Sequence, residues 1–526
     1  MAKMKPPSSG VRVRMYNPGF GDCFLLAFKG PSRRTVYVLI DCGVHGAFKG
    51  GSDQIRKVIA DVREATGGKI DLVVATHEHA DHVSGFYLGR HLFSGKKKNG
   101  HADPAGGIEV EEVWFGWTED PRSRKARRLD KVKKLLMQGM MASPQAMSPD
   151  ENDSLRTMLG FYSMDARPRP ETTDLPLGGN VLGVSTRDAR DTLRRHAKKA
   201  SYHKPKEKPL TIPGVRNVRV FVLGPPEEEE FLLSPDPTGT RGEVFEGEGH
   251  EGHHLRFDQE EAQVAALDAA GRVPEETGRA PSAERYQPFG GNHRRQIDKV
   301  RARPDLYPFF HERYGFDDDG GDDKPNSAWR RIDEEWQNSA DSFALKLDSA
   351  TNNSSLVLAI ELERSKRVLL FPGDAQVGNW KSWHRGGWSH KNGLARGQEI
   401  TARDLLARTV LYKVGHHGSH NATLKEQGLD LMTSKDLIAM IPVDEQWARA
   451  RRPHSWKMPF GPMYEDLKTR TRGRIVRTDR GVLKGEGRTK KLRDQRQAEI
   501  DTAWREFPGG VTAETDLYTE VLIRDT

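Results

Sequence analysis

The loop Thr76–His82 is the densest group of side chains able to do chemistry, with three imidazoles and two carboxylates among seven residues. Imidazole and carboxylate are ligands that Zn, Mn and Fe accept in proteins. Alternate positions let His77 and His79 face one ion while Asp81 and His82 turn toward a second. The loop therefore predicts a metal centre, and two adjacent divalent ions could activate a water molecule for hydrolysis.

The elements that must position this loop form a strand, helix, strand sequence. A helical period begins near Ser52 and Asp53, which could cap it, and stops at Gly67. The fully apolar run that follows ends directly at the histidine loop, which is typical of a buried strand. Apolar runs between turn residues predict the strands of this opening region over residues 11–15, 24–28, 36–40 and 70–75.

Regular strand patterns return in the last third of the chain, over residues 343–347, 355–362, 368–371, 410–414 and 437–443. Between them the pattern weakens, with strands expected over 107–117 and 217–223, a helix over 122–136, and acidic insertions over 227–261 and 317–323. We therefore expect four regions: one half of a fold over 11–95, remaining core strands with charged insertions over 96–342, the other half over 343–483, and a basic-to-mixed extension over 484–526.

Composition narrows the class of protein. Only Cys23 and Cys42 are present, so a disulfide framework and a thiolate zinc cluster are excluded, which fits a reducing compartment. No run of 18 apolar residues occurs and no apolar segment follows Met1–Gly10. A cytoplasmic protein with no membrane segment is the expectation. The net charge of +8 mildly favours an anionic partner.

The spacing His-x-His-x-Asp-His after a strand, helix, strand unit resembles the signature of the metallo-β-lactamase fold hydrolases. The resemblance extends to 39–43, 368–375 and 411–419. It implies a mixed α/β (α+β) fold, an αββα sandwich of two sheets with metals at one edge, here with long insertions in the middle third. Gly19–Asp22, Asn352–Leu358 and His416–Ser419 further resemble the soluble domain of competence-type (ComEC-like) DNA-uptake proteins.

This resemblance implies one or two divalent ions, Zn or Mn, as cofactors. It implies the following metal ligands: His77, His79, Asp81, His82, Asp374, and either His416 or His417. His77 and His79 would hold one ion, and Asp374 would bridge both. Asp81 and Asp374 would therefore belong to the catalytic centre. Asp41, at the end of an earlier strand, would orient the histidine loop.

The sequence also departs from the family pattern. A third histidine is expected between the first loop and Asp374, but the corresponding strand ends in Gly224-Pro225. Six histidines of the middle region lie in polar segments, which indicates solvent-exposed side chains: His101, His196, His203, His250, His253 and His254. His454 resembles a downstream histidine of the subgroup and could bind or protonate substrate, or it could be an ordinary loop residue.

The most favoured function is a metal-dependent hydrolase, a phosphodiesterase or nuclease that uses a metal-activated water. One alternative is hydrolysis of a small phosphoester, cyclic nucleotide or lactone-type metabolite. Another is a binding module with a degenerate metal site, because the third histidine is missing. Oxidoreduction is disfavoured, since di-iron flavoproteins of this fold normally carry Glu at the position of His79.

A basic stretch could supply the grip on a nucleic acid. Residues 449–496 hold 16 basic and five acidic residues, and Arg122–Lys134 is similarly basic. Arg470, Arg472 and Arg474 are the candidate phosphate contacts, with a solvated basic surface as the alternative. The expected partners are therefore a nucleic acid or a small phosphoester and no membrane, and the sequence indicates no particular protein partner.

Overall fold

The computed structural model describes residues 3–95, 103–104, 106–141, 160–162, 185–232, 242–245, 302–305, 307–309, 347–348, 350–451 and 455–526. The chain divides into two compact units. The first comprises residues 1–131, 149–252 and 346–526 and contains both large sheets. The second comprises 132–148 and 253–345, of which the described parts are the end of helix α4 (Arg124–Met141) and the segments 302–305 and 307–309.

The first sheet has eight strands in the order β16-β17-β1-β2-β3-β4-β5-β6. From β3 to β6 neighbouring strands run parallel, and the remaining pairs are antiparallel. The strands are β1 (Gly10–Tyr16), β2 (Cys23–Lys29), β3 (Thr35–Cys42), β4 (Lys69–Val74), β5 (Glu109–Gly116), β6 (Ala197–His203), β16 (Gly509–Glu514) and β17 (Tyr518–Arg524).

The second sheet has seven strands in the order β15-β14-β13-β12-β9-β8-β7. Its central strands β9, β12, β13 and β14 are parallel to one another. The strands are β7 (Val218–Gly224), β8 (Val357–Leu362), β9 (Arg367–Phe371), β12 (Thr409–Lys413), β13 (Ile438–Ile441), β14 (Ile475–Arg477) and β15 (Gly481–Val482), and a separate hairpin joins β10 (Gly387–Trp388) to β11 (Ile400–Thr401).

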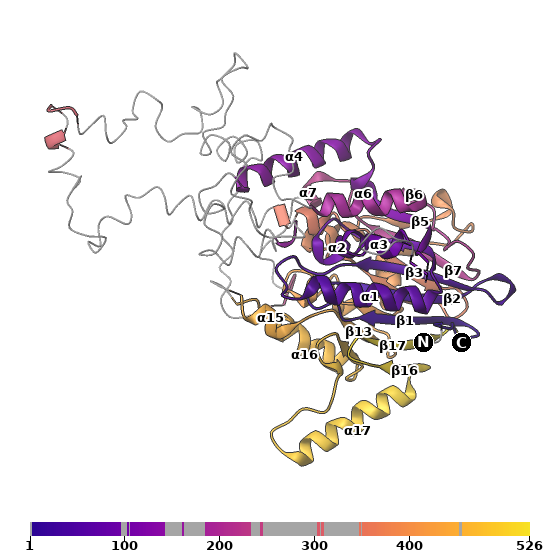
Figure 1. Ribbon diagram of the computed structural model, residues 1–526. Coiled ribbons are helices and arrows are strands. Elements are labelled where there is room, and N and C mark those ends of the chain that lie inside the picture. Colours follow the sequence, from indigo (N-terminus) through magenta and orange to yellow (C-terminus); the bar gives the residue numbers. More distant parts are fainter. Residues whose placement is uncertain are drawn as a thin grey trace. The chain divides into compact units, whose positions relative to one another are not determined.

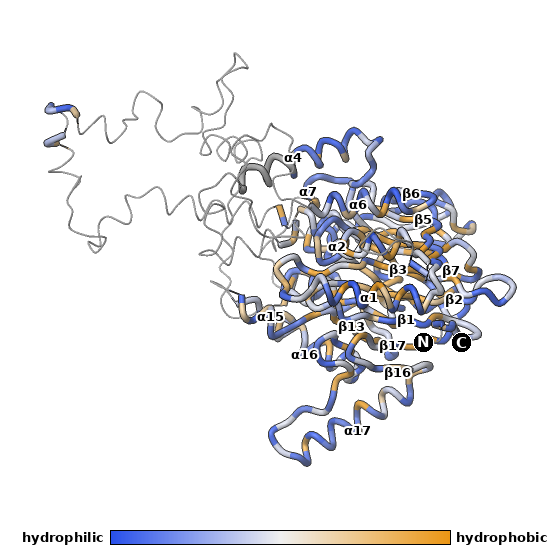
Figure 2. The backbone as a smooth tube through the Cα atoms, viewed as in Figure 1, coloured by the Kyte–Doolittle hydropathy of each residue, from blue (hydrophilic) through white to orange (hydrophobic). Residues whose placement is uncertain are grey.

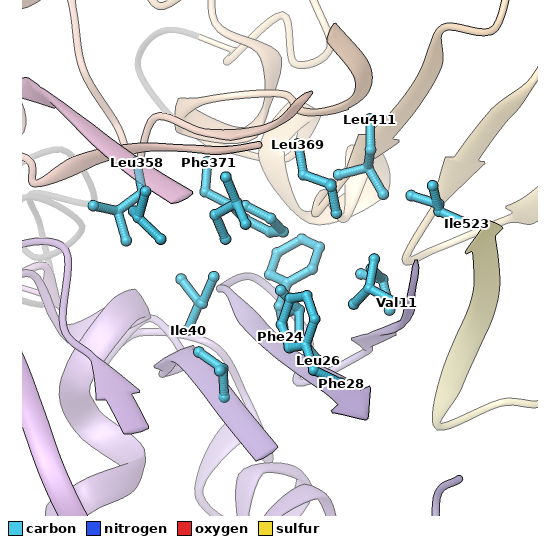
Figure 3. Packing of buried hydrophobic residues seen from close by; sticks show 14 of the residues in the cluster. Val11, Phe24, Leu26, Phe28, Ile40, Leu358, Leu369, Phe371, Leu411 and Ile523 are labelled. Carbon is cyan, nitrogen blue, oxygen red and sulfur yellow. The ribbon is translucent and has the colours of Figure 1, made fainter. Parts of the chain in front are cut away.

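The two sheets pack face to face through one apolar core (Figure 3). Phe24 and Ile40 of the first sheet lie opposite Leu358 and Phe371 of the second, and the rings of Phe24 and Phe371 meet edge to face with centroids 5.5 Å apart. Burial of such large apolar side chains is the main stabilising contribution to a sandwich of this kind.

Helices cover the outer face of each sheet, so the predicted αββα sandwich is confirmed (Figure 1). Figure 2 shows the hydrophobic residues gathered along the strands. The first sheet packs against α1 (Gly51–Thr66), α2 (Ala80–Leu88), α3 (Arg90–Phe93) and α6 (Thr186–His196). The second packs against α13 (Val377–Trp383), α14 (Ala402–Ala407) and α16 (Gly461–Arg470). Further helices of the described residues are α7 (Glu229–Leu232), α15 (Glu445–Arg449) and α17 (Lys490–Glu506).

The C-terminal extension, residues 484–526, contributes strands to the first sheet. Helix α17 leads into β16 and β17, and β17 pairs antiparallel with β1 along its whole length, so that Val11 lies opposite Ile523. The boundary expected at residue 484 is therefore not a boundary of the core, because the extension supplies two strands of the first sheet.

Two further expectations differ from the structure. The strand expected over 343–347 falls largely outside the described residues, and Leu347, its one described residue, is helical. Strand β6 was not expected, because Ala197–His203 is a polar edge strand with only one buried residue. Most of the acidic stretch 227–261 and all of 317–323 lie outside the described residues. Within the described part of the chain, no helix is both long and apolar enough to cross a membrane.

Candidate metal centre

The predicted ligands lie at the carboxyl ends of three strands. Strand β4 leads into the histidine loop, β9 into Asp374, and β12 into His416 and His417. Asp81 and His82 occupy the first turn of α2. Parallel strands place their carboxyl ends at one edge of a sheet, which is where open α/β folds bind ligands. The chain therefore brings residues more than 300 positions apart into contact, as between Asp81 and His417.

Asp81, His82, Asp374 and His417 form a four-residue cluster, here called site 2, whose ligand atoms all lie within 4.8 Å of one another. His82 Nε2 is 3.0 Å from Asp374 Oδ2 and 3.6 Å from Asp81 Oδ2. His417 Nε2 is 2.8 Å from the same Asp81 oxygen. All four side chains are fully buried. Two imidazole nitrogens and two carboxylates at these separations could hold a divalent ion.

The hydrogen bonds of site 2 fix which imidazole nitrogen faces the cluster. His82 Nδ1 donates to Asp41 Oδ2 at 2.8 Å, and His417 Nδ1 donates to the carbonyl oxygen of Pro442 at 2.6 Å. In the neutral rings the Nε2 atoms then carry lone pairs, which face carboxylate oxygens. Acceptors this close repel unless a positive charge lies between them. Without a cation, the imidazole ring itself would have to carry the positive charge. Burial lowers the pKa of His417, but the hydrogen bond to Asp81 raises it above its usual value.

His77 and His79, here called site 1, show the same arrangement. His77 Nε2 and His79 Nδ1 lie 3.1 Å apart. The hydroxyl of Thr76 donates to Asp41 Oδ2 and so accepts from His77 Nδ1 at 3.1 Å. His79 Nε2 lies 3.0 Å from the hydroxyl of Tyr162, which donates onward. The two remaining nitrogens, His77 Nε2 and His79 Nδ1, therefore carry lone pairs that face one another, as in a pair of ligands to one ion.

Asp374 directs one of its two carboxylate oxygens toward site 2. Its Oδ1 accepts from Lys413 Nζ at 3.0 Å and from the backbone N–H of His416 at 2.9 Å. Its Oδ2 makes no hydrogen bond and lies against His82. Burial by itself would raise the pKa of Asp374, but the charges of His82 and Lys413 hold it well below the usual value. The carboxylate is therefore ionised, with one oxygen held by the protein and the other available.

The buried charge of this region fits divalent cations. The carboxylates that lie around the two sites are Asp22, Asp41, Asp81, Asp348 and Asp374, each less than a tenth exposed. One buried cation, Lys413, contacts Asp22 and Asp374. Oxygens of Asp22, Asp81, Asp348 and Asp374 have no hydrogen-bond partner. Uncompensated buried carboxylates are strongly unfavourable, so the donor set suits one or two divalent ions.

The structure distinguishes His416 from His417. His416 Nδ1 lies 3.0 Å from Ser419 Oγ and 3.3 Å from Gln376 Nε2, and burial lowers its pKa to about 4. His417 instead reaches Asp81 in site 2. Both residues have positive φ angles, 45° and 53°, a backbone strain that tends to occur at functional sites.

Asp41 lies behind the histidine loop as the resemblance implies. Its two oxygens accept from the backbone N–H and the hydroxyl of Thr76 and from His82 Nδ1, each at 2.8 Å. A second cluster of possible ligands, formed by Asp22, Asp41 and His82, is a poorer metal site than site 2. There Lys413 already lies 2.5 Å from Asp22, and the proton on His82 Nδ1 serves Asp41.

The position of the missing histidine is closed by packing. A Cβ atom on Gly224 would lie 2.2 Å from Asn379 Oδ1, so no side chain fits at the end of β7. The amide of Asn379 instead donates to the carbonyl oxygens of Asn353 and Ser355, and the hydroxyl of Ser355 accepts from the N–H of Asp374. The Asn-Asn-Ser-Ser motif therefore holds the Asp374 loop in place.

Tyr162 and Asp348 are site residues that the sequence analysis missed. Tyr162 is fully buried, accepts from His79 and donates to Thr351 Oγ1 at 3.2 Å. Asp348 Oδ1 lies 3.6 Å from His79 Nε2. The segment 160–162 is held by backbone hydrogen bonds to Gly46, Ala80 and Thr186. Part of the middle insertion thus belongs to the metal centre.

The three candidate phosphate contacts do not lie at this edge. They precede β14, which is parallel to β12 and β13, so they lie at the opposite edge of the sheet from the ends that carry His417 and Asp374. Arg474 is buried and donates to the carbonyl oxygens of Leu437, Ala503 and Lys435. Arg470 pairs with Asp430 and Asp466, and Arg472 pairs with Glu506. Arg470, Arg472 and Arg474 therefore lie away from the metal ligands, and their role in substrate binding stays a prediction.

The remaining histidines are placed as follows. His454 lies outside the described residues, as do His101, His250, His253 and His254. His196 is partly exposed and stacks on Phe93. His203 was expected at the surface but is buried, because its ring packs on Trp114 and its Nδ1 lies 2.8 Å from Glu207.

Comparison with known proteins agrees with this geometry. The sequence model of the metallo-beta-lactamase superfamily matches residues 16–104, which include the histidine loop and Asp41. No curated protein matches the chain. The match, the αββα sandwich and the His/Asp cluster together indicate a metal-dependent hydrolase.

Proposed function

We propose that the protein is a phosphodiesterase that cleaves nucleic acid with two divalent ions, Zn or Mn, at sites 1 and 2. The observation that carries this is the His/Asp cluster of site 2, in which Asp374 Oδ2 lies beside His82, next to the His77 and His79 pair of site 1, whose ring nitrogens face one another. Two adjacent ions supply Lewis-acid polarisation of a phosphoryl oxygen and a water nucleophile that is active near neutral pH.

The residues of the chain would have distinct tasks. His77 and His79 would hold the first ion, and Asp81, His82 and His417 the second, with Asp374 between them. Lys413 would keep Asp374 ionised and fix its orientation, since its ammonium contacts Oδ1 and leaves Oδ2 available. Asp41 and Tyr162 would keep the correct tautomer on the histidines in front of them.

The three motifs that resemble the DNA-uptake subgroup all meet at this centre, which supports a phosphodiester as substrate. Asp22 of the first motif contacts Lys413. Ser355 of the second accepts from the N–H of Asp374, and Ser419 of the third contacts His416. A small phosphoester or a lactone-type metabolite would need the same metals, so the choice between polymer and small molecule depends on the surroundings of the centre.

The test is metal analysis of the purified protein, followed by incubation with single- and double-stranded DNA, RNA, a cyclic nucleotide, a lactone and a chromogenic phosphodiester, each with Mn or Zn. Two ions per chain and cleavage of an oligonucleotide are expected. Cleavage of only the small substrates would indicate that the protein is a small-molecule hydrolase and not a nuclease. Absence of bound metal at micromolar concentrations of either ion would support the degenerate binding module instead.

A further inference from the structure

A cluster of aromatic rings, here called the aromatic wall, lines one side of the metal centre. It consists of Phe20, His45, Phe161, Trp447 and Trp456. His45 is central, with ring centroids 4.4 Å from Phe161 and 4.9 Å from Trp447. The five rings come from four separate parts of the chain: the β1–β2 turn, the end of β3, the 160–162 segment and the α15 region.

The aromatic wall touches one ligand of each site. The ring of Phe20 lies 3.9 Å from that of His417 in site 2, and the ring of Phe161 lies 5.2 Å from that of His79 in site 1. Substrate held by both ions would therefore lie close to these rings.

The aromatic wall also reaches the surface. Phe20, His45 and Phe161 are buried, whereas Trp447 and Trp456 are partly exposed. None of the five belongs to the three hydrophobic clusters that hold the sheets and helices together. The wall is thus a separate cluster that runs from the metal ligands to two accessible indole rings, Trp447 and Trp456, whose centroids lie 5.8 Å apart.

Basic residues neighbour the two tryptophans. The guanidinium of Arg451 lies 4.3 Å over the ring of Trp447, and the exposed Lys457 follows Trp456 directly in the chain, whereas the exposed Arg449 pairs with Glu445. Aromatic faces beside cationic side chains are the combination that binds single-stranded nucleic acid, because bases stack on the rings and phosphates meet the charges. In a duplex the base faces are covered by their neighbours, so this surface fits an unpaired strand.

We infer that Trp447 and Trp456 stack an unpaired base of a nucleic-acid strand next to the phosphodiester bound at the metal centre. This rests on the proposed function and narrows its substrate to single strands. A cyclic nucleotide carries the same chemistry, a base beside a phosphodiester, but reaches no flanking charges. The strand is the occupant we commit to, because the charges of Arg451 and Lys457 are complementary to the phosphates that flank a stacked base.

The experiment compares Trp447→Ala and Trp456→Ala with the unchanged protein on two strands of equal length, a single-stranded oligodeoxynucleotide and an abasic strand with the same phosphates. Each variant should raise KM for the base-containing strand about tenfold and leave the abasic strand unaffected. Trp447→Phe and Trp456→Phe should restore most of the loss, since a phenyl ring still stacks. Trp504→Ala, which removes a partly exposed tryptophan of α17, is the matched control and should change neither substrate.

Equal losses on the two strands, or no loss on either, would overturn the inference. Loss confined to a cyclic nucleotide would assign the tryptophans to a small substrate instead. Metal content and thermal melting of each variant separate a folding defect from lost stacking, and the Phe variants remain informative if an Ala variant misfolds. If the protein cleaves no strand, the proposed function fails, but the inference is still tested: a base-containing strand should quench tryptophan fluorescence of the metal-loaded protein, and an abasic strand should not.

Discussion

Site 1 and site 2 both draw on the histidine loop, with the rings of His77 and His82 4.1 Å apart, yet the chain supplies them unequally. Site 2 has four candidate ligands whose atoms lie within 4.8 Å of one another, two of them anionic. Site 1 has two imidazoles, and the place of the usual third histidine is closed by Asn379 against Gly224. Fewer anionic ligands mean a weaker hold on a hard divalent ion. Under the proposed function, the first ion would therefore depend more on Asp374 than the second would.

The change expected to have the largest effect is Asp374→Ala, because both sites lose a ligand and the two cations lose the charge between them. Hydrolysis should fall by about 10³-fold or more, and bound metal should drop below one ion per chain. Rates and elemental analysis would measure this. Asp436→Ala, which removes a carboxylate paired with Arg367 at the start of β13, is the control that should keep both ions. Unchanged metal content in the Asp374 variant would refute the shared-ligand arrangement.

The pair His416→Ala and His417→Ala tests site 2 by itself. His417→Ala should lose one ion and most of the activity, because the variant lacks the ring nitrogen that lies 2.8 Å from Asp81 in site 2. His416→Ala should keep both ions, since its ring contacts Gln376 and Ser419. Metal-to-protein ratios after desalting give the answer. Equal metal loss in the two variants would mean that His416 also coordinates.

Stepwise removal of metal should show the inequality directly. Titration of the loaded protein with a chelator is expected to release two equivalents in separate phases, the first from site 1. His77→Ala should abolish only the early phase and retain about one ion per chain, held by the four ligands of site 2. A single phase in the unchanged protein, or loss of both ions in the variant, would show that the sites are not unequal in the way their ligands indicate.

The smallest expected effect is that of Tyr162→Phe, which removes the hydroxyl that accepts a hydrogen bond from His79 Nε2. Such partners typically contribute about tenfold in metal affinity, here at site 1 alone. Tyr412→Phe removes a buried hydroxyl that contacts Thr423 and serves as the matched control. Competition with a metal indicator dye would measure both affinities. A shift at site 2 in the Tyr162 variant would argue against a role through His79.

How far the sequence reveals this centre depends on the distance between partners along the chain. The histidine loop is a compact pattern after an apolar strand, so Asp81 and His82 could be recognised, and the Gly-Asp strand end identified Asp374. Tyr162 contacts His79 across 83 positions and lies in a polar insertion with no periodic pattern. No local signal could have assigned it, because only the folded chain shows where residues 160–162 are held.

Other sequence patterns were ambiguous for a similar physical reason. The Lys and Arg residues of a basic stretch give the same sequence pattern whether their side chains contact solvent, carboxylates or backbone oxygens. Arg474, for example, donates to three backbone carbonyl groups. His416 and His417 are adjacent, so sequence could not decide which ring faces Asp81. The last strand was missed because its apolar run, Val521–Ile523, is only three residues long, a signal that is too short to be specific by itself.

The pairing of β17 with β1 has a consequence for how the chain is made. Ser9 donates to the carbonyl oxygen of Asp525, 516 positions along the chain. The pairing of β1 with β17 in the first sheet therefore joins segments that are very far apart in the sequence. During synthesis β1 emerges from the ribosome long before its partner and waits with one edge unpaired. Exposed strand edges recruit other chains, and non-local pairing is slow. Nascent chains are therefore most vulnerable to aggregation until β17 is released, and deletion of residues 518–524 would leave that vulnerability in place permanently.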